Sequence, residues 1–243
     1  MRAAILTDIH ANLPALEAVI AATDEAGIEK RWCLGDVVGY GAQPDDCARL
    51  VQQSCELCLV GNHDLAVTGE LDTEVFSASA AAAVEWTRAN CASETIEFLR
   101  GLRPDATDRE VGLYHASPRD PVWEYVLALD QALECMAEQS APVSLIGHSH
   151  VALYFTDGGD GRPQGGQAPA DHRLELGEGR WLVNPGSVGQ PRDGDTRAAW
   201  LELDTEAATA TYRRVEYEID SAAEAIREAG LPEMLADRLY IGQ

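Results

Sequence analysis

Short apolar runs alternate with helical patterns through the first 150 residues of this chain. Strand-like runs lie at 3–6, 32–34 and 57–60, and helices are predicted over 13–26 and from Pro44 onwards. Strands that alternate with helices in this way form a sheet with a parallel part, and the helices cover its faces. The pattern therefore restricts the chain to the α/β class.

The remaining pattern changes character at residue 150. Before it, the sequence predicts a helix over 75–102, a strand over 111–114, a helix over 128–138 and a strand over 143–146. After it, the sequence predicts strands at 151–156, 173–176, 181–183, 198–203 and 209–216, and a helix from Ser221. We expect these later strands to form a second, mostly antiparallel sheet. No repeat or linker divides the chain, so we expect a single domain of residues 1–243, with 157–172, rich in Gly, Pro and Asp, as an exposed loop insertion.

Acidic residues outnumber basic residues by 41 to 18, which gives a formal charge of −23 at pH 7. Phosphate backbones and anionic lipids repel such a protein, so neither nucleic acid nor a membrane is expected as a partner. Lys30 is the only lysine, which leaves almost no candidate for Schiff-base chemistry. The N-terminus turns polar after six residues and no apolar run approaches 18, so we expect a cytoplasmic protein.

The six cysteines are dispersed through apolar or helical stretches, which is typical of small buried thiols in a reducing compartment. Cys55 and Cys58 match the CxxC spacing of zinc and redox sites. One such pair supplies only half of a zinc site, and Cys58 lies in a strand-like run. Packing is therefore the favoured role for this pair.

Five of the six histidines follow the end of a predicted strand. They are His10, His63, His115, His148 and His150, and Asp36 has the same placement. In an open α/β sheet the carboxyl ends of the strands share one edge, where ligands bind. We therefore expect these side chains to converge on one crevice.

The converging groups are of the types that bind divalent metals. Three acids (Asp8, Asp36 and Asp64) and Asn62 accompany the five histidines, without a thiolate. Imidazole and carboxylate together suit Mn²⁺, Fe²⁺ and Zn²⁺, and there are more of these groups than one ion needs. Two ions that share a carboxylate are the natural interpretation. Asp8 and His10 are two residues apart, as are His148 and His150. On an extended backbone both side chains of each pair would point the same way, so one metal could take both members of a pair.

The candidate ligands lie in five short motifs, which are, in order, Asp8-x-His10, Gly35-Asp36, Gly61-Asn62-His63-Asp64, His115 and Gly147-His148-x-His150. This ordered series resembles the calcineurin-like metallophosphoesterase superfamily. The compact size and the segment from Asn184 to Arg192 resemble the small bacterial phosphodiesterases and phosphatases without accessory domains. The resemblance implies a four-layer α/β/β/α sandwich of two mixed sheets.

The resemblance also implies a role for each motif residue. Asp8, His10 and His150 would hold one metal ion, Asn62, His115 and His148 would hold the second, and Asp36 would bridge them. His63 would be the catalytic histidine and Asp64 its partner, although an Asp at this position could also cap the following helix. The expected cofactors are two divalent ions, with Mn²⁺ first and Fe, Zn, Ni or Co as alternatives.

The expected activity is hydrolysis of small phosphate mono- or diesters by a hydroxide that bridges two ions about 3.5–4 Å apart. His63, oriented by Asp64, would assist the leaving group. A dinucleoside polyphosphate hydrolase on the same site is the alternative. A non-catalytic scaffold is disfavoured because His63 and every ligand are present, and a serine hydrolase is rejected because Val151 replaces the final Gly of its motif.

Three residues outside the metal motifs are candidates for substrate binding. Arg119 and Arg192 lie in loops near motif segments and could bind a phosphate, although ion pairs with Asp120 and Asp193 are the alternative. Tyr40, like Trp123 and Tyr125, could stack on a base or an aryl leaving group. The expected partner is a small phosphate ester or nucleotide, and the sequence leaves a homo-oligomer open.

Overall fold

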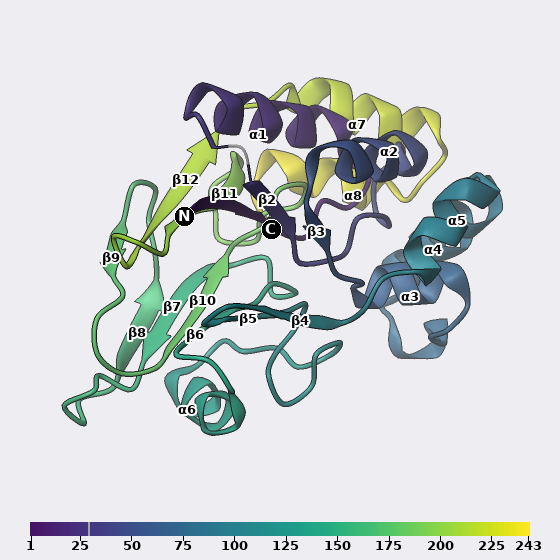
Figure 1. Cartoon of the computed structure of the whole chain (residues 1–243). Helices are drawn as coiled ribbons and strands as arrows, with labels where there is room; N and C mark the ends of the chain where they lie inside the picture. The colour runs from purple at the N-terminus through teal and green to yellow at the C-terminus, as the bar shows by residue number, and fades with distance from the viewer. Residues whose placement is uncertain (29) are drawn as a thin grey trace.

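The computed structural model describes residues 1–28 and 30–243, and its strands form two mixed sheets that face each other (Figure 1). The first sheet has the order β3 (Leu57–Cys58), β2 (Lys30–Cys33), β1 (Arg2–Leu6), β11 (Ala198–Asp204), β12 (Thr209–Val215) and β9 (Arg173–Glu175). The second has the order β4 (Asp105–Asp108), β5 (Val111–Tyr114), β6 (Val143–Leu145), β10 (Trp181–Pro185), β7 (Ala152–Thr156) and β8 (Gln164–Gln167). Each sheet contains three adjacent strands that run parallel to one another. These are β1, β2 and β3 in the first sheet and β5, β6 and β10 in the second, and antiparallel strands extend each set.

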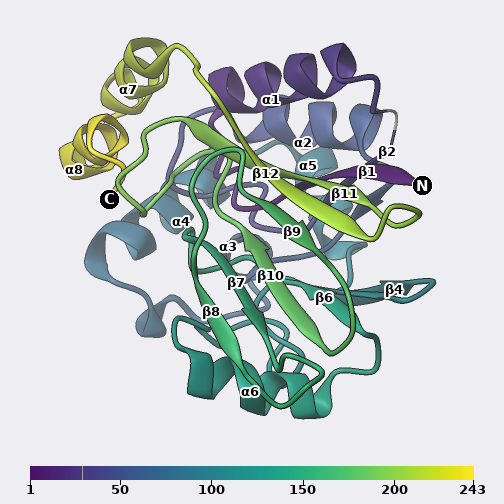
Figure 2. The ribbon, with the colours of Figure 1, turned by 90° about the vertical axis from the view of Figure 1, so that its left-hand side faces the viewer.

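The α-helices of the described residues are α1 (Leu13–Glu25), α2 (Pro44–Ser54), α3 (Asn62–Thr68), α4 (Ala78–Asn90), α5 (Ser93–Arg100), α6 (Leu129–Glu138), α7 (Ile219–Glu228) and α8 (Glu233–Asp237). Some of them cover the outer faces of the sheets, whereas α3, α4 and α5 pack on one another at the side of the sheets. Helices α1 and α2 lie over the first sheet, with α7 beside α1, and α6 lies under the second (Figures 1 and 2). These four layers confirm the predicted α/β/β/α sandwich. In the described part of the chain, no helix combines the length and apolar character that crossing a bilayer requires.

The apolar pattern of β1 shows how the layers are held together. Ala3 and Ile5 face the second sheet, whereas Ala4 and Leu6 face the helices, and all four are fully buried. A strand that is covered on both faces needs a continuous apolar run instead of an alternating one. Burial on two sides therefore explains the run that the sequence shows at residues 3–6.

The predicted division of strands between the sheets is wrong. The late strands β9, β11 and β12 do not form a separate sheet, because β11 pairs with β1 and extends the first sheet, with Ile5 opposite Leu201. The late strands β7, β8 and β10 join β5 and β6. An apolar pattern determines which face of a strand is buried but does not identify its neighbour, since pairing depends on distant parts of the chain.

Two other local predictions also differ from the structure. The helix expected over 75–102 is divided at Cys91 and Ala92 into α4 and α5, because the carboxylate of Asp45 accepts hydrogen bonds from the Ala92 N–H and the Thr95 hydroxyl. The edge strands β4 and β8 were not predicted, and β8 lies inside the segment expected as a loop. Their side chains are mostly exposed, so they lack the apolar alternation that marks a half-buried strand.

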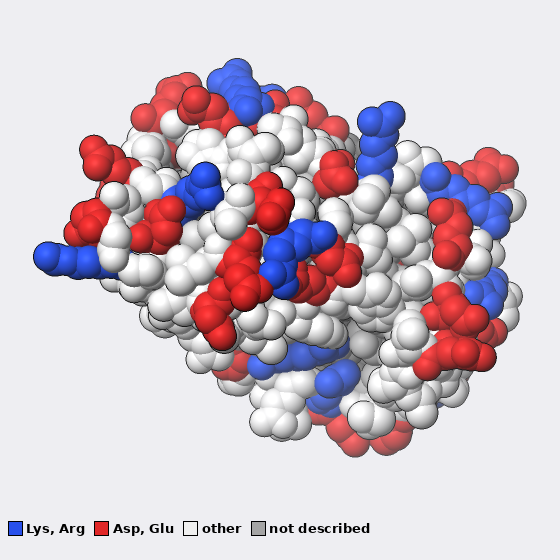
Figure 3. Space-filling model, turned by 90° about the horizontal axis from the view of Figure 1, so that it is seen from below, with Lys and Arg blue, Asp and Glu red and all other residues white. Residues whose placement is uncertain are grey.

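The cysteines and the acidic residues lie where their chemistry permits. All six cysteines are free thiols, and Cys55 and Cys58 pack against the core beneath α1 and α2. Among the described acidic residues, Asp8, Asp36 and Asp64 are the buried ones. Figure 3 shows the other charges interspersed over the surface, with red acidic groups beside most blue basic groups on that face. The large negative charge is therefore mostly hydrated.

We expect Tyr212→Phe to destabilise the contact between the sheets. The buried Tyr212 of β12 donates a hydrogen bond of 2.6 Å to the Leu153 carbonyl of β7 in the other sheet. Loss of this bond should lower the free energy of unfolding by about 1–2 kcal/mol, measured by urea denaturation of metal-free protein. Tyr240→Phe, a substitution at a tyrosine that is 43% exposed, should change it by less than about 0.5 kcal/mol. Equal effects would refute the proposed link.

Candidate metal centre

Loops that follow β1, β2, β5 and β6, together with the start of α3, bring the motif residues to one edge of the two sheets. Backbone hydrogen bonds join these loops: the Asp8 N–H donates to the Gly35 carbonyl and the His10 N–H to the Asp36 carbonyl. Because each loop is bonded to its neighbour, the side chains that they carry are fixed relative to one another.

Five of the motif residues occupy left-handed backbone conformations. The φ angles are 54° for Asp8, 51° for His10, 53° for Asp36, 64° for His148 and 60° for His150. The extended backbone expected for the two-residue spacings is therefore wrong. Left-handed φ is unfavourable for residues other than glycine, and such strain accumulates at functional sites where the surrounding structure imposes it.

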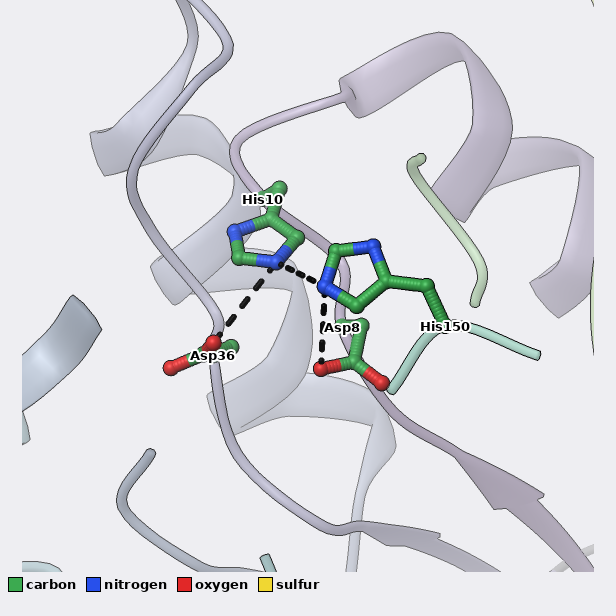
Figure 4. Close-up of side chains that lie close together, drawn as sticks. All are labelled: Asp8, His10, Asp36 and His150. Atoms are coloured by element: carbon green, nitrogen blue, oxygen red, sulfur yellow. Dashed lines mark hydrogen bonds and ion pairs between the residues drawn. The ribbon is translucent and has the colours of Figure 1, made fainter. Parts of the chain in front are cut away.

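The first cluster of ligands consists of Asp8, His10, Asp36 and His150 (Figure 4). The Nε2 atoms of His10 and His150 are 3.0 Å apart, His150 Nε2 is 3.6 Å from Asp8 Oδ1, and His10 Nε2 is 3.6 Å from Asp36 Oδ2. Ligand atoms about 2.1 Å from a shared ion lie about 3.0–3.4 Å from one another in right-angled or tetrahedral geometry. The four side chains are buried and could hold one divalent ion.

The second cluster combines Asp36 with His115 and His148, and Asn62 lies beside it. His115 Nε2 is 3.5 Å from Asp36 Oδ2 and 3.0 Å from Asn62 Oδ1. The expectation that one metal takes both members of a pair is therefore wrong for His148 and His150, which lie in different clusters, whereas Asp8 and His10 lie in the same one. Asp36 is the residue that the two clusters share.

Two buried polar atoms face this centre without a hydrogen-bond partner among the described residues. Asp36 Oδ2 lies between His10 and His115, while its other oxygen accepts a hydrogen bond of 2.9 Å from the His63 N–H. His148 Nε2 is likewise buried without a partner. Buried polar atoms of this kind are rare unless something satisfies them. A pair of divalent cations fits both the orphaned atoms and the ligand set.

Carbonyl oxygens fix the orientation of three imidazoles. His10 Nδ1 lies 3.2 Å from the Val38 carbonyl, His115 Nδ1 lies 2.9 Å from that of Leu34, and His150 Nδ1 lies 2.7 Å from that of Gln190. A carbonyl can only accept a hydrogen bond, so each Nδ1 carries the proton and each Nε2 presents a lone pair. Histidines that ligate metals are held in this way by a second hydrogen bond.

Comparison with known proteins assigns the family. The calcineurin-like phosphoesterase superfamily domain matches residues 1–206. The chain belongs to this superfamily. A metallophosphoesterase from Sphaerobacter thermophilus, known from its crystal structure, is 37% identical with a TM-score of 0.90, and each chain is fully covered. The uncharacterized protein MJ0912 of Methanocaldococcus jannaschii is 35% identical over 247 residues, which cover 99% of this chain and 98% of that protein.

A structure with lower sequence identity to this chain shares its fold. The hypothetical protein PH1004 from Pyrococcus horikoshii is 21% identical with a TM-score of 0.80, over all of this chain and 98% of the other. At this identity the match describes the fold alone. The family match and the fold together confirm the relationship that the ordered motifs predicted.

Burial sets the protonation of the candidate metal ligands. It lowers the pKa of all four imidazoles in the two clusters, so these rings are neutral and able to bind metal near pH 7. Burial raises the pKa of Asp8 to about 7, with His115 opposing and Asp36 reinforcing the shift, and it also raises the pKa of Asp36. Divalent cations would stabilise these carboxylates in their ionised form.

The ring of His63 lies beside the first cluster, at the start of α3. Its centroid is 4.9 Å from that of His10, 4.4 Å from that of Tyr40 and 5.0 Å from that of Phe76. Its Nδ1 is buried without a hydrogen-bond partner in the described chain. Burial, followed by the charge of Arg192, lowers the pKa of His63 well below the usual value. The ring is therefore neutral and available near the centre.

Asp64 is placed differently from the expectation. Its carboxylate accepts hydrogen bonds from the backbone N–H groups of Val37, Val38 and Gly61, at 3.0–3.3 Å. None of its bonds within the described residues reaches the His63 ring. Asp64 therefore caps the first turn of α3, as the alternative interpretation held, and it also bonds this turn to the loop after β2.

Gly39 creates the space that the His63 ring occupies. Its φ is +89°, and a Cβ atom there would lie 2.6 Å from His63 Nδ1. Only glycine accepts both the left-handed backbone and this close approach without displacement of the ring. The sequence offered no signal for this contact, because Gly39 lies outside the recognised motifs.

A cavity of about 300 Å³ opens beside His63 and Asn62. Its walls include four aromatic side chains and two arginines: Tyr40, Phe76, Trp123, Tyr125, Arg192 and Arg238. Tyr40, Trp123, Tyr125 and Arg192 were candidates from the sequence, whereas Phe76 and Arg238 were not. Arg238 lies in the C-terminal 3-10 turn, far along the chain from every motif, so only the folded chain shows its position.

The structure gives the two candidate arginines different surroundings. The guanidinium of Arg119 is bonded to Glu124 and Glu134 and does not line the cavity, so it is engaged in an ion pair, although not with Asp120. Arg192 donates a hydrogen bond of 3.3 Å to the Tyr40 hydroxyl, within the cavity wall.

We expect cation binding to compete with protons. Because the pKa of Asp8 is raised to about 7 without metal, this carboxyl is largely protonated below pH 7 and must lose its proton when the cation binds. The apparent affinity for Mn²⁺ should fall by about tenfold per pH unit for each proton released, between pH 8 and pH 6. Calorimetric titration in buffers of different ionisation enthalpy measures both quantities. An affinity that is constant over this range would contradict the assignment.

We expect Gly39→Ala to displace the His63 ring. Phosphoester turnover, the activity expected from the sequence, should fall by about 10- to 100-fold while the bound metal stays unchanged, because His63 is the expected catalytic histidine and small misplacements of such a group are costly. The control is Gly69→Ala, which has a similar φ of +84° but nothing within 4 Å of the added methyl. It should lower the Tm to a similar extent with normal turnover. Equal turnover in the two variants would exclude the role of Gly39.

Proposed function

We propose that this chain is a two-metal hydrolase of small phosphate mono- or diesters. The observation that carries the proposal is the position of Asp36, whose Oδ2 has no hydrogen-bond partner among the described residues and lies 3.5–3.6 Å from one histidine of each ligand cluster. Asp8, His10 and His150 would hold one ion, Asn62, His115 and His148 the second, and Asp36 both. The nitrogen and oxygen ligand set, without thiolate, suits Mn²⁺, which is the first ion to test, and also Fe²⁺ and Zn²⁺.

Two bound divalent ions would supply an activated water and offset the negative charge of the phosphoryl group. The protein holds their ligands in a buried pocket, where carbonyl oxygens fix the imidazoles. In the proposed reaction, an oxygen from water forms a bond to phosphorus while the P–O bond to the leaving group breaks. One product is the phosphate that has gained the water oxygen. The other is the leaving group with its added proton, which is an alcohol or, for a dinucleoside polyphosphate, a second phosphate compound.

His63 is the candidate proton donor to the leaving oxygen. It lines the cavity beside the candidate ligand Asn62, and its buried Nδ1 has no hydrogen-bond partner among the described residues. Burial keeps this ring neutral in the absence of substrate, and the negative charge of a bound phosphate raises the pKa of a nearby imidazole. The ring can therefore take up a proton as the substrate binds and transfer it when the P–O bond breaks.

We expect His63→Ala to abolish turnover selectively. Turnover should fall by at least about 100-fold, while the metal content stays near two ions per chain, because His63 donates a proton but is not proposed as a ligand. His172→Ala is the control, since His172 lies next to β9 outside the two clusters and should leave turnover and metal content unchanged. Rates measured with p-nitrophenyl phosphate and metal analysis of the same samples test this. Unchanged turnover in His63→Ala would disprove the assignment.

The class of ester is decided by a panel of substrates. The Mn²⁺-loaded protein should be assayed with p-nitrophenyl phosphate, bis-p-nitrophenyl phosphate and diadenosine tetraphosphate, which represent a monoester, a diester and a dinucleoside polyphosphate. Hydrolysis of the third substrate alone would favour the alternative function. A fully metallated protein that hydrolyses none of the three would refute the proposed function.

A further inference from the structure

Two arginines in the cavity wall share one neutral acceptor. Arg192 Nη2 is 2.8 Å from Gln190 Oε1, and Arg238 Nη1 is 3.2 Å from the same oxygen. Both guanidiniums also lie near the Tyr40 ring, with their carbon atoms 5.6 Å and 6.0 Å from its centroid. Segments 46 residues apart in the sequence therefore bring two positive charges to the same point in the cavity.

Neither arginine is paired with an Asp or Glu side chain among residues 1–28 and 30–243. Most other arginines in this acidic protein have such a partner, as Arg119, Arg213 and Arg227 illustrate. Arg192 Nε is buried without a hydrogen-bond partner in the described chain, and Arg238 Nε donates only to the Gln243 main-chain oxygen. Burial and the charge of Arg192 lower the pKa of Arg238, as expected for two like charges without a neutralising anion.

The two arginines and His63 line the same cavity and neighbour the same Tyr40 ring, whose centroid is 4.4 Å from that of His63. Because His63 is the proposed proton donor to the leaving oxygen, we infer that the arginines lie on the leaving-group side of the candidate metal centre. A group bound by the arginines therefore belongs to the part of the substrate that departs. Guanidinium groups bind phosphate oxygens through two parallel hydrogen bonds, which makes phosphate the anion that fits best.

We propose that Arg192 and Arg238 form a subsite for a second phosphate, so that the preferred substrates are phosphate esters whose leaving group carries another phosphoryl group. This inference rests on the proposed function for its reaction, but the binding of a second phosphate can be measured without turnover. Phe76, Trp123 and Tyr125 add aromatic surface to the same cavity, and Tyr125 is 43% exposed. That surface suits a nucleoside as the group that joins the phosphates.

The first test compares substrates with one and two phosphates in Arg238→Gln. The substrates are p-nitrophenyl phosphate, adenosine 3′,5′-bisphosphate, in which ribose joins the phosphates, and diadenosine tetraphosphate, in which anhydride oxygens join them. In Arg238→Gln, kcat/KM for adenosine 3′,5′-bisphosphate, for diadenosine tetraphosphate or for both should fall by about tenfold or more beyond any fall for p-nitrophenyl phosphate. The loss should come mainly from a higher KM. The affected substrate identifies the linkage. Arg238→Lys, which keeps the charge, should restore part of the loss.

The controls distinguish a subsite from a structural effect. Arg192→Gln should show the same selective loss, whereas Arg173→Gln, an exposed arginine of β9 paired with Glu175, should leave all three rates unchanged. Equal losses for all substrates in Arg192→Gln and Arg238→Gln, or no change in selectivity, would overturn the proposal.

The second test does not depend on turnover. Calorimetry should show that the Mn²⁺-loaded protein binds adenosine 5′-(α,β-methylene)diphosphate, which resists hydrolysis, at least about tenfold more tightly than adenosine monophosphate. Arg238→Gln should remove this difference. Wild-type protein that binds the two nucleotides equally would exclude the subsite, even if it hydrolyses phosphate esters. A protein that hydrolyses no ester but shows the difference would refute the proposed function and keep the subsite.

Discussion

The carboxylate of Asp36 lies where the two ligand clusters meet, and the architecture of the site depends on it. One oxygen accepts the His63 N–H, and the other is buried between His10 and His115 without a partner in the described chain. Gly61 permits this arrangement, since a Cβ there would lie 2.0 Å from the carboxylate oxygen. Because burial raises the pKa of Asp36, the folded chain holds an ionisable group whose charged form needs a cation. The packing of the neighbouring loops, the charge of the site and the proposed chemistry therefore all depend on the Asp36 side chain.

The local charge of the cavity is opposite to the charge of the molecule. The chain carries a formal charge of −23, yet Arg192 and Arg238 lie together in the cavity wall without an Asp or Glu partner among the described residues. Divalent ions at the neighbouring ligands would add further positive charge. The surface acidity, which Figure 3 shows interspersed with basic groups, is spread out and hydrated, so it is screened over about 8 Å at physiological ionic strength. An acidic protein can in this way bind a small anionic ester.

Much of the candidate site could be predicted from the sequence because the ligands follow strand ends. Parallel strands bring their carboxyl ends to one edge, so the positions of Asp8, Asp36 and His115 after apolar runs were sufficient to predict convergence. The backbone geometry could not be predicted, since left-handed φ angles at His148 and His150 arise from contacts between loops and not from local propensity. The predicted contact of Asp64 with the His63 ring was also wrong, because contacts between loops decide which groups the Asp64 carboxylate bonds. A short carboxylate accepts whichever N–H groups the neighbouring loop presents.

The residues alone were sufficient to infer the α/β class, the family and the set of side chains available to hold metal, because these depend on local apolar patterns and on short motifs. The folding of the whole chain sets which strands are neighbours, how the candidate ligands divide into two clusters and which residues complete the cavity. Strand β11 pairs with β1 across almost 200 residues, and Arg238 reaches Gln190 from the C-terminal turn. Such contacts depend on the complementary packing of surfaces that lie far apart along the chain, and no local pattern of residues encodes that packing.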